Sequence, residues 1–346
     1  MKKIIIVLLL FSVGAASISA QSKVSRWITG DLAWYPAHLQ GYGIENFAPI
    51  SYNTVPLPEL EDMENSDIED EGRDIGGQAF EVRATLIQEM EFPFLQGASP
   101  LTSQNNVKIR IKGEVSPVTI GAEVETVFSP IAFFSLDSSL SAGSGWSLIG
   151  INGLAYNTPE KTYEPAPFEG TVLETEIGAT LQFDFGVLVP GDWTHIVTVY
   201  RPSVKYEAFT AAEPDEAWQW QADGGENYNG WSWNQTGVLG YLLPAVDHVD
   251  TAGFLLETEQ RITRQDVSTM DSGGWGSDFM TVYVSPFVVV RINSHNSLTV
   301  QGQFARSRDY TDETIGNAHF SYREVDADSP VYWYFRRIAL SYRYDY

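Results

Sequence analysis

Apolar and polar residues alternate strictly along several stretches of this chain. From Val107 to Val115 the odd positions are apolar or glycine, whereas the even positions carry lysine, arginine or glutamate. A period of two places successive side chains on opposite faces of a β-strand, so this stretch is predicted to be a strand with one apolar and one charged face. The same alternation recurs in 118–128, 173–189 and 280–292. The chain is therefore predicted to be all-β.

Twelve stretches are predicted to be strands, and several match or exceed the roughly 9–11 residues that cross a bilayer at a tilt. They are 77–94, 104–115, 118–129, 132–142, 147–156, 171–189, 193–209, 236–247, 251–264, 278–292, 297–307 and 332–346. Long and short connections alternate, apart from a short one at 130–131, and such alternation is typical of membrane barrels with long external loops. We therefore predict an antiparallel transmembrane β-barrel of about twelve strands, within a range of roughly ten to fourteen, with both termini in the periplasm. The alternative is a secreted β-sandwich.

Opposite charges are predicted to pair across the first tight hairpin. With a two-residue turn at Ser116 and Pro117, Arg110 faces Glu123 and Lys108 faces Glu125. Register, sign and hydrophobicity agree in this pairing.

The charged faces of the strands are predicted to line the lumen. The expected pore-lining residues are Lys108, Arg110, Lys112, Glu123, Glu125, Glu174, Glu176, Asp184, Glu257, Glu259, Arg291, Arg337 and Arg343, with Glu81, Arg83, Glu89 and Glu91 on the same face. Isolated buried charges are costly, so such an interior needs water or dense pairing. Two interpretations stay open, namely a passage with a transverse field for small solutes and a lumen closed by salt bridges. The excess of acidic residues predicts a preference for cations.

The first 76 residues are predicted to lie outside the barrel. Lys2 and Lys3 precede an apolar run, and small residues follow as far as Ala20, which is the layout of a cleavable signal peptide over 1–20. Residues 21–76 are then expected to form an acidic periplasmic segment or a plug. Part of this segment, 58–74, is strongly acidic and predicts a solvated linker.

The last eleven residues place Ile338, Leu340, Tyr342, Tyr344 and Tyr346 on one face. This ending resembles the closing strand of bacterial outer-membrane β-barrels, porins among them. The resemblance implies a location in the outer membrane of a Gram-negative envelope, and it implies that Tyr342, Tyr344 and Tyr346 form the assembly signal read by the barrel-assembly machinery. The stretch 130–146 in addition resembles envelope proteins of spirochaetes.

One predicted external loop, 210–235, is rich in aromatic side chains among carboxylates. It holds Trp218, Trp220, Tyr228, Trp231 and Trp233. Rings beside carboxylates are what sugar-binding sites use, so this loop is a possible ligand-binding loop. The competing interpretation is that the rings pack a small core over the barrel or lie at the lipid interface.

Composition narrows the remaining classes. A formal net charge of −24 argues against nucleic acid as a partner, and the absence of cysteine excludes disulfides and thiol chemistry. No nucleotide, phosphate or metal motif predicts a cofactor or a metal site. An enzyme is not expected, because the five histidines, His38, His195, His248, His295 and His319, form no catalytic pattern. The predicted function is a porin-like channel for small solutes, with outer-membrane lipid as a partner. A non-conducting surface-binding or structural barrel and a secreted carbohydrate-binding β-protein are the alternatives.

Overall fold

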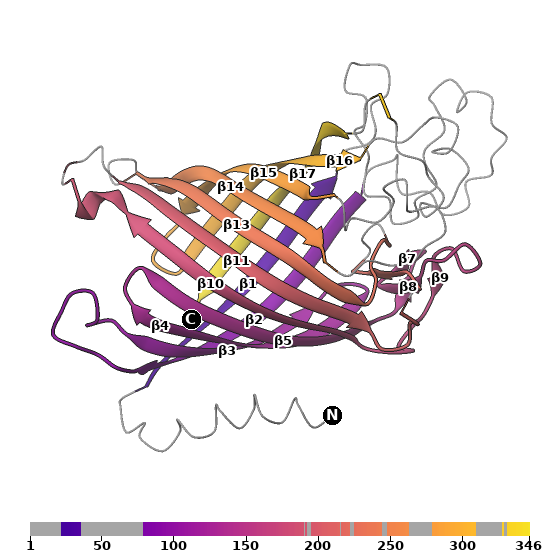
Figure 1. Cartoon of the computed structure of the whole chain (residues 1–346), viewed down its shortest axis with the longest axis horizontal. Helices are drawn as coiled ribbons and strands as arrows, with labels where there is room; N and C mark the ends of the chain where they lie inside the picture. Colours follow the sequence, from indigo (N-terminus) through magenta and orange to yellow (C-terminus); the bar gives the residue numbers. More distant parts are fainter. Residues whose placement is uncertain are drawn as a thin grey trace.

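A closed antiparallel barrel of twelve strands dominates the computed structural model (Figure 1). The structure describes residues 22–35, 79–189, 191, 195–214, 216–221, 225–243, 248–262, 279–308, 327–328 and 331–346. The barrel strands are β1 (Lys23–Tyr35), β2 (Ala79–Pro93), β3 (Asn106–Val115), β4 (Thr119–Ile131), β5 (Phe134–Gly145), β10 (Val172–Asp184), β11 (Ile196–Phe209), β13 (Gly230–Leu242), β14 (Val249–Arg261), β15 (Thr281–Arg291), β16 (Asn296–Arg308) and β17 (Val331–Asp345). The predicted transmembrane-type barrel and its strand number are confirmed.

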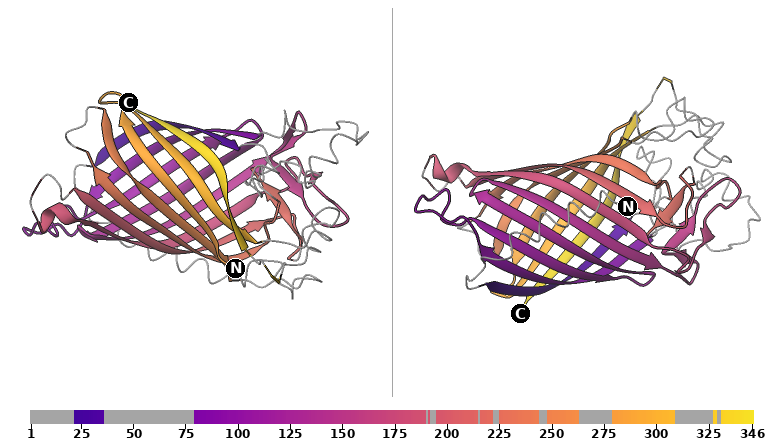
Figure 2. Two further views of the ribbon diagram at one scale, coloured as in Figure 1. Left: turned by 90° about the horizontal axis from the view of Figure 1, so that it is seen from above. Right: turned by 60° about the horizontal axis from the view of Figure 1, so that its bottom comes forward.

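Closure joins the two ends of the chain. Strand β1 pairs with β2 on one side and with β17 on the other, and every other barrel strand pairs with its neighbours in chain order. The strands run at a tilt to the barrel axis in both views of Figure 2. A single closed sheet has no free edge and is not a sandwich of two sheets, so the β-sandwich alternative is wrong.

The outer surface of the barrel is apolar along the strands. Val124, Leu140, Ile177 and Phe254 expose between 49% and 66% of their surface, and each points away from the lumen. Their neighbours in sequence carry the polar face, as the alternation predicts. A soluble protein rarely exposes so continuous an apolar band, and this band matches a bilayer.

The start of β1 and the end of β17 lie at the same end of the barrel, here called the terminal end. Lys23 pairs with Glu91, and the Tyr346 backbone amide donates to the Arg26 carbonyl at 3.2 Å. The connections 94–105, 132–133 and 292–295 and the described parts of 185–195 lie here. The opposite end, here called the loop end, carries the connections 116–118 and 146–171 and the described parts of 210–229.

Two elements differ from the prediction. Residues 23–35, assigned to the segment before the barrel, are its first strand. Residues 147–156, expected to be a barrel strand, form β6 (Ser147–Leu148), β7 (Ile151–Asn152) and β8 (Leu154–Tyr156) outside the barrel sheet. The chain reverses between β6 and β7 because Ile149 and Gly150 both adopt positive φ, 52° and 76°.

These two corrections cancel in the strand count but reverse the direction of β2 to β5. The connection 116–118 therefore lies at the loop end, and 132–133 is an ordinary short turn of the terminal end. The hairpin register is also corrected by two residues. Pro117 occupies the second position of the turn, Ser116 pairs with Thr119, and Lys112 rather than Arg110 faces Glu123.

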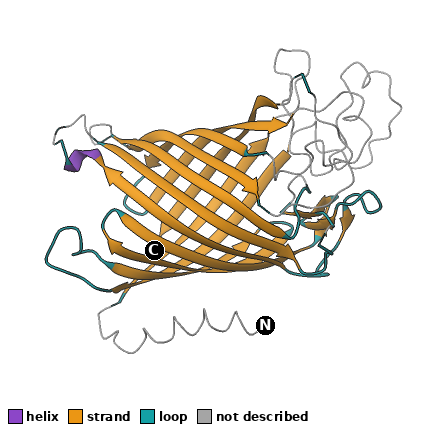
Figure 3. Ribbon diagram, in the orientation of Figure 1, coloured by secondary structure: helices purple, strands orange, loops and turns teal. Residues whose placement is uncertain are grey.

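The described connections outside the barrel form little regular structure (Figure 3). At the loop end, β12 (Trp218–Trp220) pairs with β8, which pairs with β9 (Glu164–Pro165). One short 3-10 helix, Phe185–Val187, follows β10. No helix among the described residues is long and apolar enough to cross a bilayer. The predicted signal peptide and the acidic stretch 58–74 lie outside the described residues.

Candidate functional site: the barrel lumen

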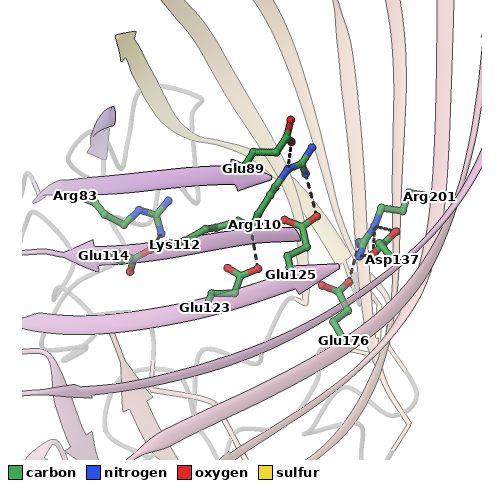
Figure 4. A network of polar contacts seen from close by, with 10 residues as sticks. All are labelled: Arg83, Glu89, Arg110, Lys112, Glu114, Glu123, Glu125, Asp137, Glu176 and Arg201. Atoms are coloured by element: carbon green, nitrogen blue, oxygen red, sulfur yellow. Dashed lines mark hydrogen bonds and ion pairs between the residues drawn. The ribbon is translucent and has the colours of Figure 1, made fainter. Parts of the chain in front are cut away.

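A continuous ladder of alternating charges lines the lumen on β2, β3 and β4. In order along the wall it consists of Glu91, Lys108, Glu89, Arg110, Glu125, Lys112 and Glu123. Each cation touches two carboxylates. Arg110, for example, lies 2.7 Å from Glu89 and 3.1 Å from Glu125 (Figure 4). We call this set the charged ladder.

The ladder follows from strand geometry. Its members occupy alternate positions on three adjacent strands, so their side chains share one face of the sheet. Cross-strand neighbours of opposite sign then meet without any loop to position them. Five of the predicted pore-lining residues belong to the charged ladder. They are Lys108, Arg110 and Lys112 on β3 and Glu123 and Glu125 on β4.

Solvent reaches the ladder although it lies inside the barrel. The side chains of Lys108, Arg110 and Lys112 keep 27%, 29% and 27% of their surface accessible. These groups are thus neither fully buried nor packed against an opposite wall.

A second cluster centres on Arg201 of β11. Its guanidinium contacts Asp137 of β5 and lies 2.9 Å from Glu176 of β10 (Figure 4). To reach Asp137 it crosses β10 at Gly178, where a Cβ atom would lie 2.8 Å from the guanidinium. Gly178 therefore makes this pairing possible, because any larger residue would occupy the path of the arginine.

Lys205 extends this cluster towards the loop end. It lies 2.9 Å from Glu207 and 3.7 Å from Glu259, and Glu207 also binds Arg261 at 2.8 Å. Glu174 stands in register with Glu207. Glu174 makes no ion pair among the described residues, although the charge of Lys205 lies near it.

The other predicted pore-lining residues lie at several heights. Glu257 accepts a hydrogen bond from Gln303 at 3.4 Å. Asp184 caps the 3-10 helix that follows β10, so it belongs to a turn at the terminal end. Arg291 pairs with Asp250 and Arg343 with Asp345, and their side chains are 62% and 44% exposed at that same end.

Sequence reasoning missed Arg201, Lys205 and Glu207 on β11, and it also missed Arg336 on β17. Between β16 and β17 the register shifts, with Gln303 opposite Arg337 and Phe304 opposite Phe335. Arg336 is the extra residue of this β-bulge. Both Arg336 and the predicted Arg337 therefore face the lumen, and we call them the arginine pair.

Parts of the connections 146–171 and 210–229 fold together at the loop end, and we call this unit the cap. Its core contains Leu154, Tyr156, Ala166 and Trp218, which pack on Val172 and Phe209 at the ends of β10 and β11. In the cap, Lys161 donates to Glu216 at 3.0 Å, and this hydrogen bond raises the pKa of Lys161.

The cap reaches the lumen wall at two points. The indole of Trp220 would lie 2.8 Å from a Cβ atom at Gly143, so it rests on the inner face of β5. Gln221, in a left-handed conformation with φ 55°, donates to Glu114 of β3 at 2.6 Å. Glu114 in turn lies 3.6 Å from Arg83, which links the cap to the wall near the charged ladder.

The structure divides the five aromatic residues of the possible ligand-binding loop. Trp218 and Tyr228 are buried, 1% and 2% exposed, and Trp220 packs against the core of the cap. Trp231 and Trp233 belong to β13 and point outward, where Trp231 packs against Tyr206 with ring centroids 5.0 Å apart and planes tilted by 53°. The rings thus form no common surface, and the interpretation as a small core with outward rings fits their positions.

The described histidines and the terminal tyrosines lie apart from the lumen clusters. His248 and His295 lie in turns of the terminal end, where their ring nitrogens approach backbone carbonyls at 3.3 and 3.1 Å. His195 precedes β11, whereas His38 and His319 lie outside the described residues. Tyr342 and Tyr344 face outward on β17 beside Tyr346, and their role in assembly stays a prediction.

Fold and lumen together define a β-barrel of the outer-membrane type. Among solved structures, similar folds include the KdgM porin, with a TM-score of 0.35, 10% identity, and coverage of 77% of this chain and 93% of that one. The outer membrane channel DcaP of Acinetobacter baumannii has a TM-score of 0.35 and 8% identity, over 96% of this chain and 99% of that one. The outer membrane phospholipase A from Escherichia coli has a TM-score of 0.29 and 10% identity, over 93% of this chain and 96% of that one. No family model and no curated protein matches the sequence. At these values the fold assignment rests on the strand pairing of the chain itself.

Proposed function

We propose that this chain is an outer-membrane channel through which small solutes pass passively, with a preference for cations. The observation that carries the proposal is the charged ladder inside a closed barrel, in which the three cations stay partly exposed to solvent. A lumen filled by side chains would bury these groups.

The free-energy cost of desolvating charged groups favours water around the charged ladder. Removing a charged group from water costs several kcal/mol, and pairing restores this only when the geometry is good. The salt bridges of Lys108 span 3.6 Å, which is long for a pair that would have to pay for full burial. A hydrated lumen removes that cost.

The direction of the ion pairs also supports a passage. The ladder joins adjacent strands, and the Arg201 and Lys205 pairs join strands that are adjacent or next but one. These pairs run around the wall and none of them connects opposite walls. They stiffen the barrel and leave its axis free.

The preference for cations is inferred from the charge balance. The ladder holds four carboxylates and three cations, and Glu174 adds a carboxylate without an ion pair among the described residues. Fixed negative charge at the wall concentrates cations near it.

Single-channel recording in a planar bilayer tests both parts of the proposal. We expect discrete current steps from the refolded protein and a reversal potential of the cation-selective sign in a KCl gradient. The variant Glu174→Gln should lower this selectivity, whereas Glu160→Gln, on an exposed residue of the cap, should leave it unchanged. Silence from protein that is folded and inserted would refute the channel.

The cap favours one alternative, a non-conducting barrel that binds a ligand at the surface. Strands β11 and β13 are neighbours, so a short Gly-Ser linker can replace 212–228 without separating them. A channel should conduct at least as well without the cap. A binding barrel should lose its ligand and stay silent.

A further inference from the structure

The arginine pair has fewer carboxylate partners than most cations of the lumen. Six lumen cations each contact two carboxylates, namely Arg83, Lys108, Arg110, Lys112, Arg201 and Lys205. Arg337 has one, Glu81, at 3.5 Å. Arg336 makes no ion pair with a carboxylate within the part of the chain that the structure describes.

The contacts of Arg336 are to neutral groups. Its guanidinium donates to the amide oxygen of Gln303 at 2.9 Å and lies 4.6 Å from the ring centre of Tyr283 and 6.0 Å from that of Tyr35. A guanidinium has five N–H donors, so most of them remain available towards the lumen.

The neighbouring Arg337 also keeps an unused donor. It donates to the hydroxyl of Tyr35 at 3.0 Å, and that hydroxyl donates to Glu81 at 2.8 Å. Its Nε atom is buried and has no hydrogen-bond acceptor. A buried donor without an acceptor is costly, and a ligand oxygen would satisfy it.

The β-bulge is the cause of this arrangement. In a regular strand Arg336 would point to the lipid and Arg337 to the lumen, so two consecutive residues could not act together. The register shift places two planar forks of donors side by side, with a single carboxylate to neutralise them. Arginine forks match the oxygens of carboxylate and phosphate groups.

We propose that Arg336 and Arg337 form a binding site for the oxyanion of a small solute, a carboxylate or a phosphate, on the lumen wall. Tyr35 and Tyr283 form the apolar sides of this site. The proposal rests on the lumen being open to solutes, as proposed above, but binding at equilibrium does not require conduction.

Isothermal titration calorimetry on the full chain, folded in detergent micelles at low ionic strength, tests the site. Inorganic phosphate and succinate are titrated separately. We expect saturable binding of at least one of them, and the pattern identifies the preferred oxyanion. Arg336→Gln should weaken binding by about tenfold or more, the effect of losing one charge-assisted interaction.

The matched control lies on the same strand and the same face. Arg343 is a lumen-facing arginine of β17 whose charge is already paired with Asp345, so Arg343→Gln should change the affinity less than about twofold. Arg336→Lys, which keeps the charge but loses the fork, should give an intermediate affinity. Folding of each variant is checked by its heat-modifiable migration in electrophoresis.

Three results would overturn the site. They are the absence of saturable binding of either anion, an unchanged affinity in Arg336→Gln, and an equal loss in Arg343→Gln. Current steps in the bilayer with no anion binding would refute this site alone, whereas binding without current would refute the channel alone.

Discussion

The two faces of β5 can be distinguished by one substitution made at two adjacent positions. Leu140 lies near the middle of β5, is 60% exposed, and points outward beside Val124 of β4. Ser139 points into the lumen, in register with Glu125 on one side and Glu176 on the other. We compare Leu140→Arg with Ser139→Arg.

The two substitutions are expected to lower the free energy of unfolding by amounts that differ several-fold. An arginine on the lipid face of a membrane barrel costs about 2–4 kcal/mol near the bilayer midplane. At Ser139 the new guanidinium meets water and two carboxylates that are already paired with Arg110 and Arg201, so its effect should stay within about 1 kcal/mol.

The assay is reversible unfolding by guanidinium chloride from phospholipid vesicles, followed by tryptophan fluorescence. The free energy of unfolding is extrapolated from the linear dependence on denaturant concentration. Equal losses in both variants, or a larger loss in Ser139→Arg, would contradict the assignment of the two faces and with it the membrane-spanning barrel.

Three further results are expected. Gly178→Leu should displace Arg201 and lower the free energy of unfolding by about 1–3 kcal/mol, measured in the same way, and an unchanged stability would show that the arginine has another path. We expect the cap to narrow the passage, because Trp220 and Gln221 reach the inner wall. Gln221→Ala removes the hydrogen bond from the cap to Glu114 and should therefore increase single-channel conductance, and a reduced conductance would contradict this expectation. Deletion of β1 opens the barrel, so the shortened chain should give no heat-modifiable band, and a folded band would refute closure through β1.

Strands with one uniform face could be predicted from the sequence, and β1 shows where this fails. In β3 and β10 the outward positions are all apolar, small or threonine, so the period of two is visible. In β1 the outward face contains Arg26 and Gly30, and the inward face contains Trp27 and Tyr35. Neither face is uniform, because the inward rings pack among side chains of the lumen rather than against lipid.

The prediction of a barrel strand over 147–156 fails for the opposite reason. Its composition suits a strand, but Ile149 and Gly150 reverse the chain, and isoleucine at positive φ has no signature in the sequence. Part of this stretch, β8, pairs with β12 at Trp218, which is far away in sequence. The cap therefore depends on tertiary packing, which local sequence patterns do not reveal.

The charged ladder could be predicted by the same reasoning, whereas Arg201 and Lys205 on the regular strand β11 were not predicted, and Arg336 could not be, because it depends on an irregularity. The ladder members Lys108, Arg110 and Lys112 follow from alternation alone. Arg336 does not, because strict alternation from Arg337 assigns it to the lipid face, and only the bulge turns it inward. Bulges change the direction of side chains and are frequent near functional sites. The bulge at Arg336 therefore marks this position as a candidate functional site.

Charge pairing separates the parts of the lumen that hold the barrel together from the part that is free to bind. A cation such as Arg110, held between two carboxylates, already has its charge neutralised within the wall. A solute anion would have to displace a carboxylate from it, which cancels most of the gain. Arg336 has no carboxylate to displace among the described residues, so in the proposed site its interaction with a solute oxyanion would avoid this cost. The wall of this barrel can therefore be stiff along the ladder and selective at the bulge, because the two tasks fall on different cations.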